Sequence, residues 1–325
     1  MTKPTLGVDF FSINGIPSDV DAMAAAFPFG WYQISNGMEV NIMTRLAWPT
    51  YAKHYGPYFF FNPYPGDNWM YQSFLVYAEE AARLFVQVLN GNFGACPPMI
   101  DVEQNFTDAT LALLYPGGTI AANRAKGNQL FMQMLKITSD TIESLTGKIP
   151  VIYTGYFFWS AFNTSDTAWA ARNPLCLASY PYDNYSSQSA YLTALQGIMS
   201  GAVTLPAAYV PAPWASATWQ QFTGKAPASL IPGYAKESNW ANTVDMSILK
   251  VVAPVPPIST NTYLTTVAVN VHSAPSGTSS IIAILPQKTE VQVYGTPTAG
   301  YSRISADGVT PQQWVYSSYL IKEVD

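Results

Sequence analysis

Short hydrophobic runs alternate with longer segments of helical periodicity through residues 1–250. The runs have the length of single strands and read, in order, LGVDFFS, GWYQIS, GPYFFFNPY, PPMIDVE, IPVIYTGY, PLCLASY, ATWQQFT and TVDMSIL. Between them, residues 70–90 and 122–146 carry apolar residues at the spacing of amphipathic helices, and Gly147 is a predicted C-cap. Strands that alternate with helices form mostly parallel sheets, and about eight such repeats predict an α/β fold of the β/α-barrel type.

A different pattern begins after residue 250. Residues 251–263, VVAPVPPISTNTY, are rich in Pro, Ser and Thr and are predicted to form an extended linker. Residues 264–325 consist of short alternating runs separated by Gly, Pro, Asn and Ser, without a helical period. This pattern predicts a small all-β barrel. We therefore expect a β/α-barrel domain over 1–250, a linker, and a β domain over 264–325.

Two acidic residues end the fourth run, PPMIDVE, although strand interiors avoid unpaired charge. Asp101 and Glu103 are two positions apart, so their side chains lie on the same face of the strand. In β/α barrels the reacting groups sit at the carboxyl ends of the strands. Two carboxylates this close raise each other's pKa, so one can stay protonated and act as a general acid. On this short motif alone, two solvated strand-end carboxylates are the commoner case.

Other runs also carry polar or aromatic residues near their ends. Asp9 ends the first run, Tyr153 stands in the fifth, Tyr180 ends the sixth and Asp245 lies in the last. In the seventh run Gln220 and Gln221 follow Trp219. Closure of a barrel is expected to bring such residues to one edge.

The composition narrows the classes of partner. Of the 325 residues 49% are hydrophobic and 11% are charged, with a net charge of −5. This balance argues against a nucleic-acid partner, which needs a basic surface. No apolar run reaches the ~18 residues of a membrane span, and no polybasic segment is present, so no membrane partner is expected. The opening MTKPTLGVDFFSING shows no apolar stretch of a secretory signal.

The cysteines and histidines are too few for several kinds of site. Cys96 and Cys176 do not make a disulfide framework and are predicted to be buried free thiols. His54 and His272 fall in different predicted domains, whereas zinc hydrolases use two or three histidines on the metal. We therefore expect no metal and no cofactor.

Taken in order, the runs of the first domain resemble those of the family 25 glycoside hydrolases, the Chalaropsis-type lysozymes. The matching stretches include GVDFFSING, FGWYQISNG, PPMIDVE, GKIPVIYTGYFFW, TWQQFT and NTVDMSIL, and they span nearly all of residues 5–250. The last 60 or so residues resemble a bacterial SH3 domain, through VNVHSAPS and QWVYSSYL. A catalytic barrel followed by such a module is the layout of a peptidoglycan-cleaving lysin.

The resemblance implies an activity and a set of site residues. Family 25 enzymes cut the β-1,4 bond between N-acetylmuramic acid and N-acetylglucosamine in bacterial cell walls. The family's general acid falls on Glu103, and its three aspartates fall on Asp101, Asp9 and Asp245. The SH3-like module is expected to bind a wall component. Because no signal sequence is visible, a phage-released lysin is favoured over a secreted bacterial enzyme.

Aromatic and amide side chains near the strand ends are the predicted contacts to the sugar rings. They are Tyr58, Phe60, Tyr153, Tyr180, Trp219 and Gln220, although aromatic residues are also common filler in barrels. Two departures from the family put such contacts in question. Tyr58-Phe59-Phe60 stands where Y-H-F is frequent, and Asn36 stands where an acid is usual. Long connections over 104–121 and 181–213 are expected to be cleft walls or plain surface loops.

Two other functions remain open from the sequence. A chitinase-like barrel glycosidase would carry a longer D-x-x-D-x-D-x-E strand, but residues 96–99 are Cys-Pro-Pro-Met. A non-catalytic wall-binding protein has no need of all four acids. The products released from cell walls would separate these functions from a muramidase.

Overall fold

The chain forms two compact units, Met1–Lys250 and Val251–Asp325. The computed structural model describes residues 3–10, 18–40, 42–64, 73–181, 187–234, 243–250, 261–287, 289–304 and 313–322. Of the predicted linker, residues 251–260 lie outside the described residues, and residues 261–263 belong to the first strand of the second unit. Each unit is described here by itself.

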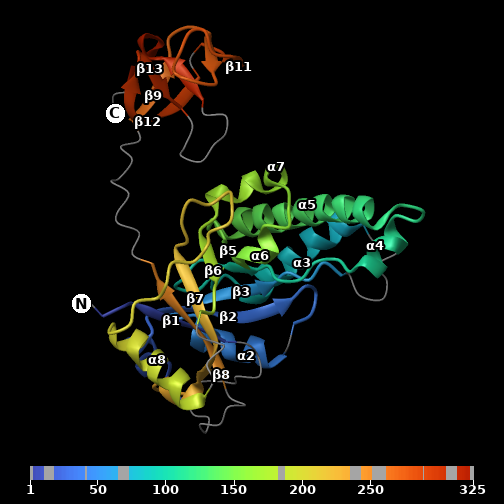
Figure 1. Ribbon diagram of the computed structural model, residues 1–325, viewed down its shortest axis with the longest axis vertical. Helices are drawn as coiled ribbons and strands as arrows, with labels where there is room; N and C mark the ends of the chain where they lie inside the picture. The colour runs from blue at the N-terminus through green and yellow to red at the C-terminus, as the bar shows by residue number, and fades with distance from the viewer. Residues whose placement is uncertain are drawn as a thin grey trace. The chain divides into compact units, whose positions relative to one another are not determined.

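Eight strands of the first unit close into a barrel (Figure 1). The strands are β1 (Leu6–Phe10), β2 (Phe29–Asn36), β3 (Gly56–Phe60), β4 (Met99–Asp101), β5 (Val151–Gly155), β6 (Leu175–Ala178), β7 (Trp219–Pro227) and β8 (Thr243–Leu249). Neighbours from β1 to β7 are parallel, whereas β8 runs antiparallel to both β7 and β1. The predicted β/α barrel is confirmed, with one reversed strand at its closure.

Helices connect most of the strands. They are α1 (Val20–Ala26), α2 (Ile42–Tyr51), α3 (Phe74–Leu89), α4 (Asp108–Leu114), α5 (Ile120–Thr146), α6 (Tyr156–Trp159), α7 (Thr164–Thr167) and α8 (Gln188–Ser200), with short 3₁₀ helices at Ala168–Arg172 and Ala228–Leu230. Both helices predicted from periodicity are present, as α3 and α5, and Gly147 caps α5 with a φ of 68°. Positive φ favours glycine, so this residue type ends the helix at this point.

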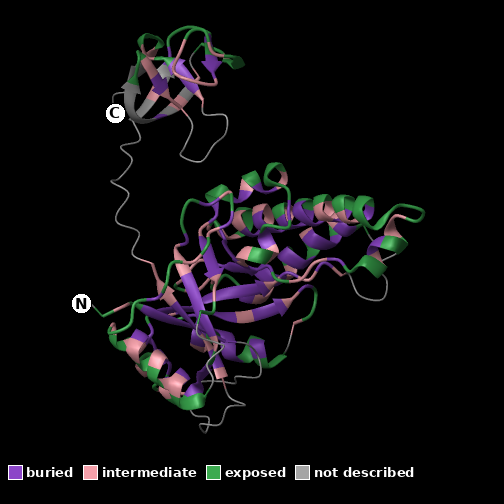
Figure 2. Cartoon of the chain, in the orientation of Figure 1, coloured by how far each residue is buried: buried purple, intermediate pink, exposed green. Residues whose placement is uncertain are grey.

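The strands separate two layers of apolar side chains. Inside the barrel, the buried residues are Phe29, Trp31, Tyr58, Met99, Val151, Tyr153 and Cys176. The larger layer lies between the strands and the helices, where Phe59 of β3 meets Phe85 of α3 with ring centroids 5.7 Å apart. Because strand side chains alternate, Tyr58 points inward and Phe59 outward. Strands β1 to β6 are accordingly buried along almost their whole length (Figure 2), whereas β8 is buried at three of its seven positions.

The two long connections are not plain loops. Residues 104–121 contain α4 and residues 181–213 contain α8, while 182–186 lie outside the described residues. Each helix begins at a hydroxyl N-cap: the Thr110 amide donates to Thr107 Oγ1 at 3.1 Å, and the Ala190 amide donates to Ser187 Oγ at 3.3 Å. The capping residues stand in the sequence, but the helices are too short to show a clear period.

The second unit is all-β, as predicted. Its strands are β9 (Asn261–Thr265), β10 (Val269–His272), β11 (Ile281–Leu285), β12 (Glu290–Thr298), β13 (Tyr301–Arg303), β14 (Trp314–Tyr316) and β15 (Leu320–Lys322), with a 3₁₀ helix at Ser317–Tyr319. They form one antiparallel sheet in the order β11-β10-β14-β13-β12-β9-β15. Val269, Val271 and Val315 make its buried core.

Candidate active site

Asp9 and Asp245 are brought together by the reversed strand. Their Cα atoms are partners across the β1–β8 pair. Because β8 is antiparallel, its first residues lie at the same edge as the carboxyl ends of the parallel strands. We call this edge the mouth of the barrel. Asp245, the third residue of β8, therefore lies beside Asp9, which is one residue from the carboxyl end of β1.

Asp9 is buried, with 4% of its surface exposed, and its carboxylate is held by three donors. Its Oδ1 accepts a hydrogen bond from the Trp31 amide at 3.0 Å, and its Oδ2 accepts from Gln221 Nε2 at 3.2 Å and from Ser247 Oγ at 3.4 Å. Burial, with a smaller contribution from Asp245, raises the pKa of Asp9 to about 8. The side chain is thus fixed in place and holds its proton near neutral pH.

Asp101 is the last residue of β4 and is 8% exposed. Its Cα pairs with Phe60 on one side and with Tyr153 on the other. Burial raises its pKa well above the usual value, and the charges of Glu103, Asp245 and Asp9 raise it further. Within the described part of the chain, Asp101 Oδ1 has no hydrogen-bond partner. A buried oxygen of this kind is free to accept a hydrogen bond from a ligand.

Glu103 lies two residues beyond the end of β4 and is exposed. Loss of hydration raises the pKa of its carboxyl, while a hydrogen bond with Tyr153 lowers it by a smaller amount. Asp101 and Glu103 thus retain a proton at pH values where isolated carboxyl groups have lost theirs. Of the two, Glu103 is the one that solvent and a ligand can reach.

Tyr153 and Tyr180 join this group through Gln221. The two hydroxyl oxygens are 2.8 Å apart, and Tyr153 Oη donates to Gln221 Oε1 at 2.5 Å. Tyr180 Oη donates to the same amide oxygen. Since Gln221 Nε2 donates to Asp9, a continuous hydrogen-bonded chain runs from Asp9 through Gln221 to the tyrosines beside Glu103.

The glutamine in this chain is Gln221, whereas Gln220 was the predicted contact. Side chains alternate along β7, so Gln220 points to the opposite face, where its Nε2 faces the Ser179 carbonyl at 3.4 Å. The assignment of Gln220 to the site is corrected for this reason. Gln221 stands two residues after Trp219 in the sequence, so the two side chains share a face of the strand. This spacing was the signal in the sequence by which Gln221 could have been found. Ser247 and the Trp31 amide were also missed, because they contact Asp9 from other strands.

The predicted aromatic contacts fall into two groups. Tyr58 is buried beneath the acids, and burial together with the charge of Asp101 raises its pKa well above the usual value. Phe60 is half-buried at the carboxyl end of β3, on the same inner face. Trp219 instead opens β7 at the far end of the barrel, where its ring meets Trp31 at 5.2 Å. Trp219 therefore packs against the apolar side chains inside the barrel, and its assignment as a sugar contact is corrected.

Neither histidine lies in this group. His54 Nε2 is 2.7 Å from Asp21 Oδ1 outside the barrel, and His272 ends β10 in the second unit. Among the described residues no group of three or more His, Cys, Asp or Glu side chains is arranged to hold a metal ion.

The described helices include none that is long and apolar enough to cross a membrane. Cys176 is buried and Cys96 half-buried, and both are free thiols.

Four carboxyl groups gather at the mouth of a β/α barrel, and burial raises the pKa of three of them, Asp9, Asp101 and Glu103. This arrangement defines the chain as a glycoside hydrolase by class. The family comparison agrees. The barrel unit belongs to the glycosyl hydrolases family 25, whose model matches residues 53–204, and the second unit is a bacterial SH3 domain, matched over residues 267–321. Asp101 and Glu103 lie inside the matched region. Asp9 and Asp245 lie outside it in the sequence, and closure of the barrel brings them to the same edge.

Several solved structures are similar to this chain at low identity. The spore cortex lytic enzyme SleM of Clostridium perfringens is 16% identical, with 98% of each chain covered and a TM-score of 0.49. The bacterial lysozyme of Streptomyces coelicolor is 17% identical, with 77% of this chain and 94% of that chain covered and a TM-score of 0.47. A family 25 hydrolase of Bacillus anthracis is 15% identical, with 76% and 89% covered and a TM-score of 0.45. No curated protein gave a significant match.

Proposed function

We propose that this chain is a peptidoglycan hydrolase of the N-acetylmuramidase type, which cleaves the β-1,4 bond between N-acetylmuramic acid and N-acetylglucosamine. The observation that carries the proposal is the meeting of Asp101 and Glu103 with Asp9 and Asp245 at one edge of the barrel. Family membership supplies the substrate class, since lysozymes and muramidases are among the structures that share the fold.

Glu103 acts as the general acid. It is exposed at the mouth, and its raised pKa keeps a proton available at higher pH than for a free glutamate. In the first step this proton passes to the glycosidic oxygen while the bond from that oxygen to the sugar carbon breaks. The electron pair of the bond leaves with the departing sugar, and positive charge develops on the ring that remains.

The remaining acids support that charge. Asp101 lies beside Glu103 with a free oxygen, so it can accept a hydrogen bond from the substrate's acetamide group or face the developing positive charge. Asp245 lies beside Asp9, whose carboxyl group is fixed by three donors. Water, or the substrate's own N-acetyl group followed by water, completes the cleavage.

The tyrosines set the position of the acid. Tyr153 lies beside Glu103, and Tyr153 and Tyr180 each donate a hydrogen bond to Gln221. Tyr58 and Phe60 follow one another on the inner face of β3 and end beside Asp101. We assign sugar contact to Phe60, which ends β3, to Tyr180, which lies two residues beyond the end of β6, and to Tyr153 in the middle of β5. Tyr58, deeper in the barrel, supports Asp101 from below.

The second unit holds the barrel on the cell wall. It contains none of the four acids, and it matches the bacterial SH3 domain over residues 267–321. A wall-binding module raises the local concentration of the catalytic unit on an insoluble polymer. The site of action proposed for the whole chain is therefore the bacterial cell wall.

The test is the chemistry of the products. Purified cell walls digested with the protein should release fragments with new reducing ends at N-acetylmuramic acid, identified by mass spectrometry after borohydride reduction. Glu103→Gln should release none, and Glu79→Gln, which changes an exposed carboxylate on α3, should act like the wild type. New reducing ends at N-acetylglucosamine, or release of chitin oligomers alone, would replace the muramidase with another glycosidase. Wall binding without any new reducing end would show a non-catalytic protein.

A further inference from the structure

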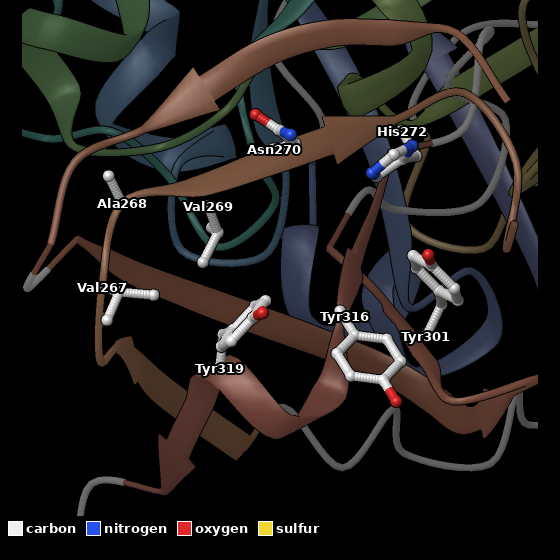
Figure 3. A pocket seen from close by; sticks show the side chains of 8 residues that line it. All are labelled: Val267, Ala268, Val269, Asn270, His272, Tyr301, Tyr316 and Tyr319. Atoms are coloured by element: carbon white, nitrogen blue, oxygen red, sulfur yellow. The ribbon is translucent and has the colours of Figure 1, made fainter. Parts of the chain in front are cut away.

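A pocket of about 560 Å³ opens on the surface of the second unit (Figure 3). Three tyrosines line it, Tyr301 of β13, Tyr316 of β14 and Tyr319 of the following 3₁₀ helix, together with Asn270 and His272 of β10. Residues 267–269 complete the wall. Its size falls within the range of sites for small organic ligands.

The rings of Tyr316 and Tyr319 lie outside the packed core of the unit, whereas Tyr301 is half-buried and His272 is buried. The buried core consists of Val269, Val271 and Val315, whereas Tyr316 and Tyr319 are each 44% exposed. The rings form a continuous row. His272 and Tyr301 have centroids 5.5 Å apart, Tyr301 and Tyr316 5.3 Å, and Tyr316 and Tyr319 5.7 Å. Exposed aromatic surface that packing does not use marks an interaction site.

The chemistry of the lining selects an uncharged ligand. Among the described residues that line the pocket there is no Asp, Glu, Lys or Arg. A ligand held in the pocket by a phosphate or carboxylate group would need a cationic partner there. The polar groups are the Asn270 amide, the His272 imidazole and the tyrosine hydroxyls, which offer both donors and acceptors. The ligand is thus one with an apolar face and neutral hydrogen-bonding groups at its rim.

Backbone pairing with a peptide is not available at this place. The lining strands β10, β13 and β14 each have a strand on both sides in the sheet. Their backbone ladders are therefore occupied, and an added peptide strand would have to join an edge at β11 or β15 instead. Recognition in the pocket depends on side chains.

We propose that this pocket binds the glycan strand of the cell wall, through pyranose rings that carry neutral N-acetyl groups. The axial C–H face of a pyranose stacks on aromatic rings, and its hydroxyl and acetamide groups bond to amides and phenols. The choice of polymer rests on the proposed function, because a site on the second unit aids the barrel only if both bind the same polymer. The second unit then reads the sugar backbone and not the attached peptides.

The experiment uses the full-length chain with Glu103→Gln, so that the glycan stays intact. Binding is measured by sedimentation with intact walls and with walls whose stem peptides have been removed by an amidase. In this background Tyr316→Ala with Tyr319→Ala should weaken binding by about tenfold or more on both materials. Tyr316→Phe with Tyr319→Phe keeps the rings and should bind nearly as the parent does. Ile284→Ala, a 66% exposed position outside the pocket, is the matched control.

Competitors identify the occupant. Soluble peptide-free glycan strands should release the parent from walls, whereas stem peptides and a proline-rich peptide should not. Loss of binding after amidase treatment, or release by either peptide, would overturn the proposal and name a peptide ligand. Equal binding by the parent and the double alanine variant would also overturn it, provided that the variant's thermal unfolding is unchanged. If the unsubstituted protein fails to cleave walls while the tyrosines still govern binding, the proposed function fails and the glycan site stands.

Discussion

Asp9 and Asp245 face each other across the seam where the barrel closes, although they stand near opposite ends of the catalytic unit. Their strands run in opposite directions, so one carboxyl group comes from near the end of its strand and the other from near the start. The pairing places two acids side by side in a largely buried setting, and this raises the pKa of Asp9 to about 8. The consequences can be measured.

Replacing Glu103 should abolish catalysis and leave the fold intact. Glu103→Gln keeps the shape of the side chain but cannot donate the proton, and loss of a general acid lowers the rate by about 10²–10⁴. Turbidity of a wall suspension reports the rate, and circular dichroism reports the fold. Wild-type clearing by a folded Glu103→Gln protein would contradict the assignment.

The stability of the protein should fall as pH rises, because of Asp9. Its pKa is about 8 in the folded chain against roughly 3.9 in an unfolded chain, so the folded state binds more protons between these values. The free energy of unfolding therefore decreases from about pH 4 to about pH 8. Asp9→Asn removes this titration, so its free energy of unfolding should depend less on pH over that range.

Urea unfolding of both proteins at several pH values gives the comparison for Asp9. The amide also loses hydrogen bonds, so the difference in slope is informative and a constant offset is not. Parallel curves for the two proteins would show that Asp9 does not have a raised pKa.

Replacing Gln221 should lower the catalytic rate, whereas replacing its neighbour Gln220 should leave it close to that of the wild type. Gln221→Leu removes the acceptor for Tyr153 and Tyr180 and one donor to Asp9, so the acids lose their alignment. We expect kcat on soluble glycan chains to fall by about tenfold or more, with a shifted pH profile. Gln220→Leu changes a side chain whose Oε1 has no partner within the described part of the chain, and should stay close to wild type. Equal losses in both variants would indicate general disruption of β7.

Truncation after Lys250 should separate catalysis from targeting. The two units are compact on their own, and the acids all lie in the first. The truncated protein should keep its activity on short soluble chains and lose much of its clearing of whole walls. Assays at several salt concentrations control for charge, since the net charge is −5. Loss of activity on soluble chains as well would mean that the second unit completes the fold.

The order of the eight strands of the barrel and the two longest helices, α3 and α5, was readable from the sequence, because each run and each of these helical periods is a local pattern. Gly147 at the end of α5 and the D-x-E pair at the end of β4 belong to this local information. The roles of Gln221 and Trp219 were not readable. The sequence shows that Trp219 and Gln221 share a face, but not where along β7 the mouth begins, and this depends on the register with β6 and β8. The reversed direction of β8 is likewise a property of closure.

The reversal of β8 also decides where the chain leaves the barrel. An eighth parallel strand would end at the mouth and deliver the following segment across the substrate's entrance. Here β8 starts at the mouth and runs to the far edge, where the Leu249 amide bonds to the Thr5 carbonyl at 2.9 Å and the Lys250 amide to the Thr218 carbonyl at 3.0 Å. Both termini of the catalytic unit thus meet at the edge remote from the acids. A module exchanged or appended after Lys250 starts from that remote edge, which makes this junction a natural point for recombining barrels with different wall-binding domains.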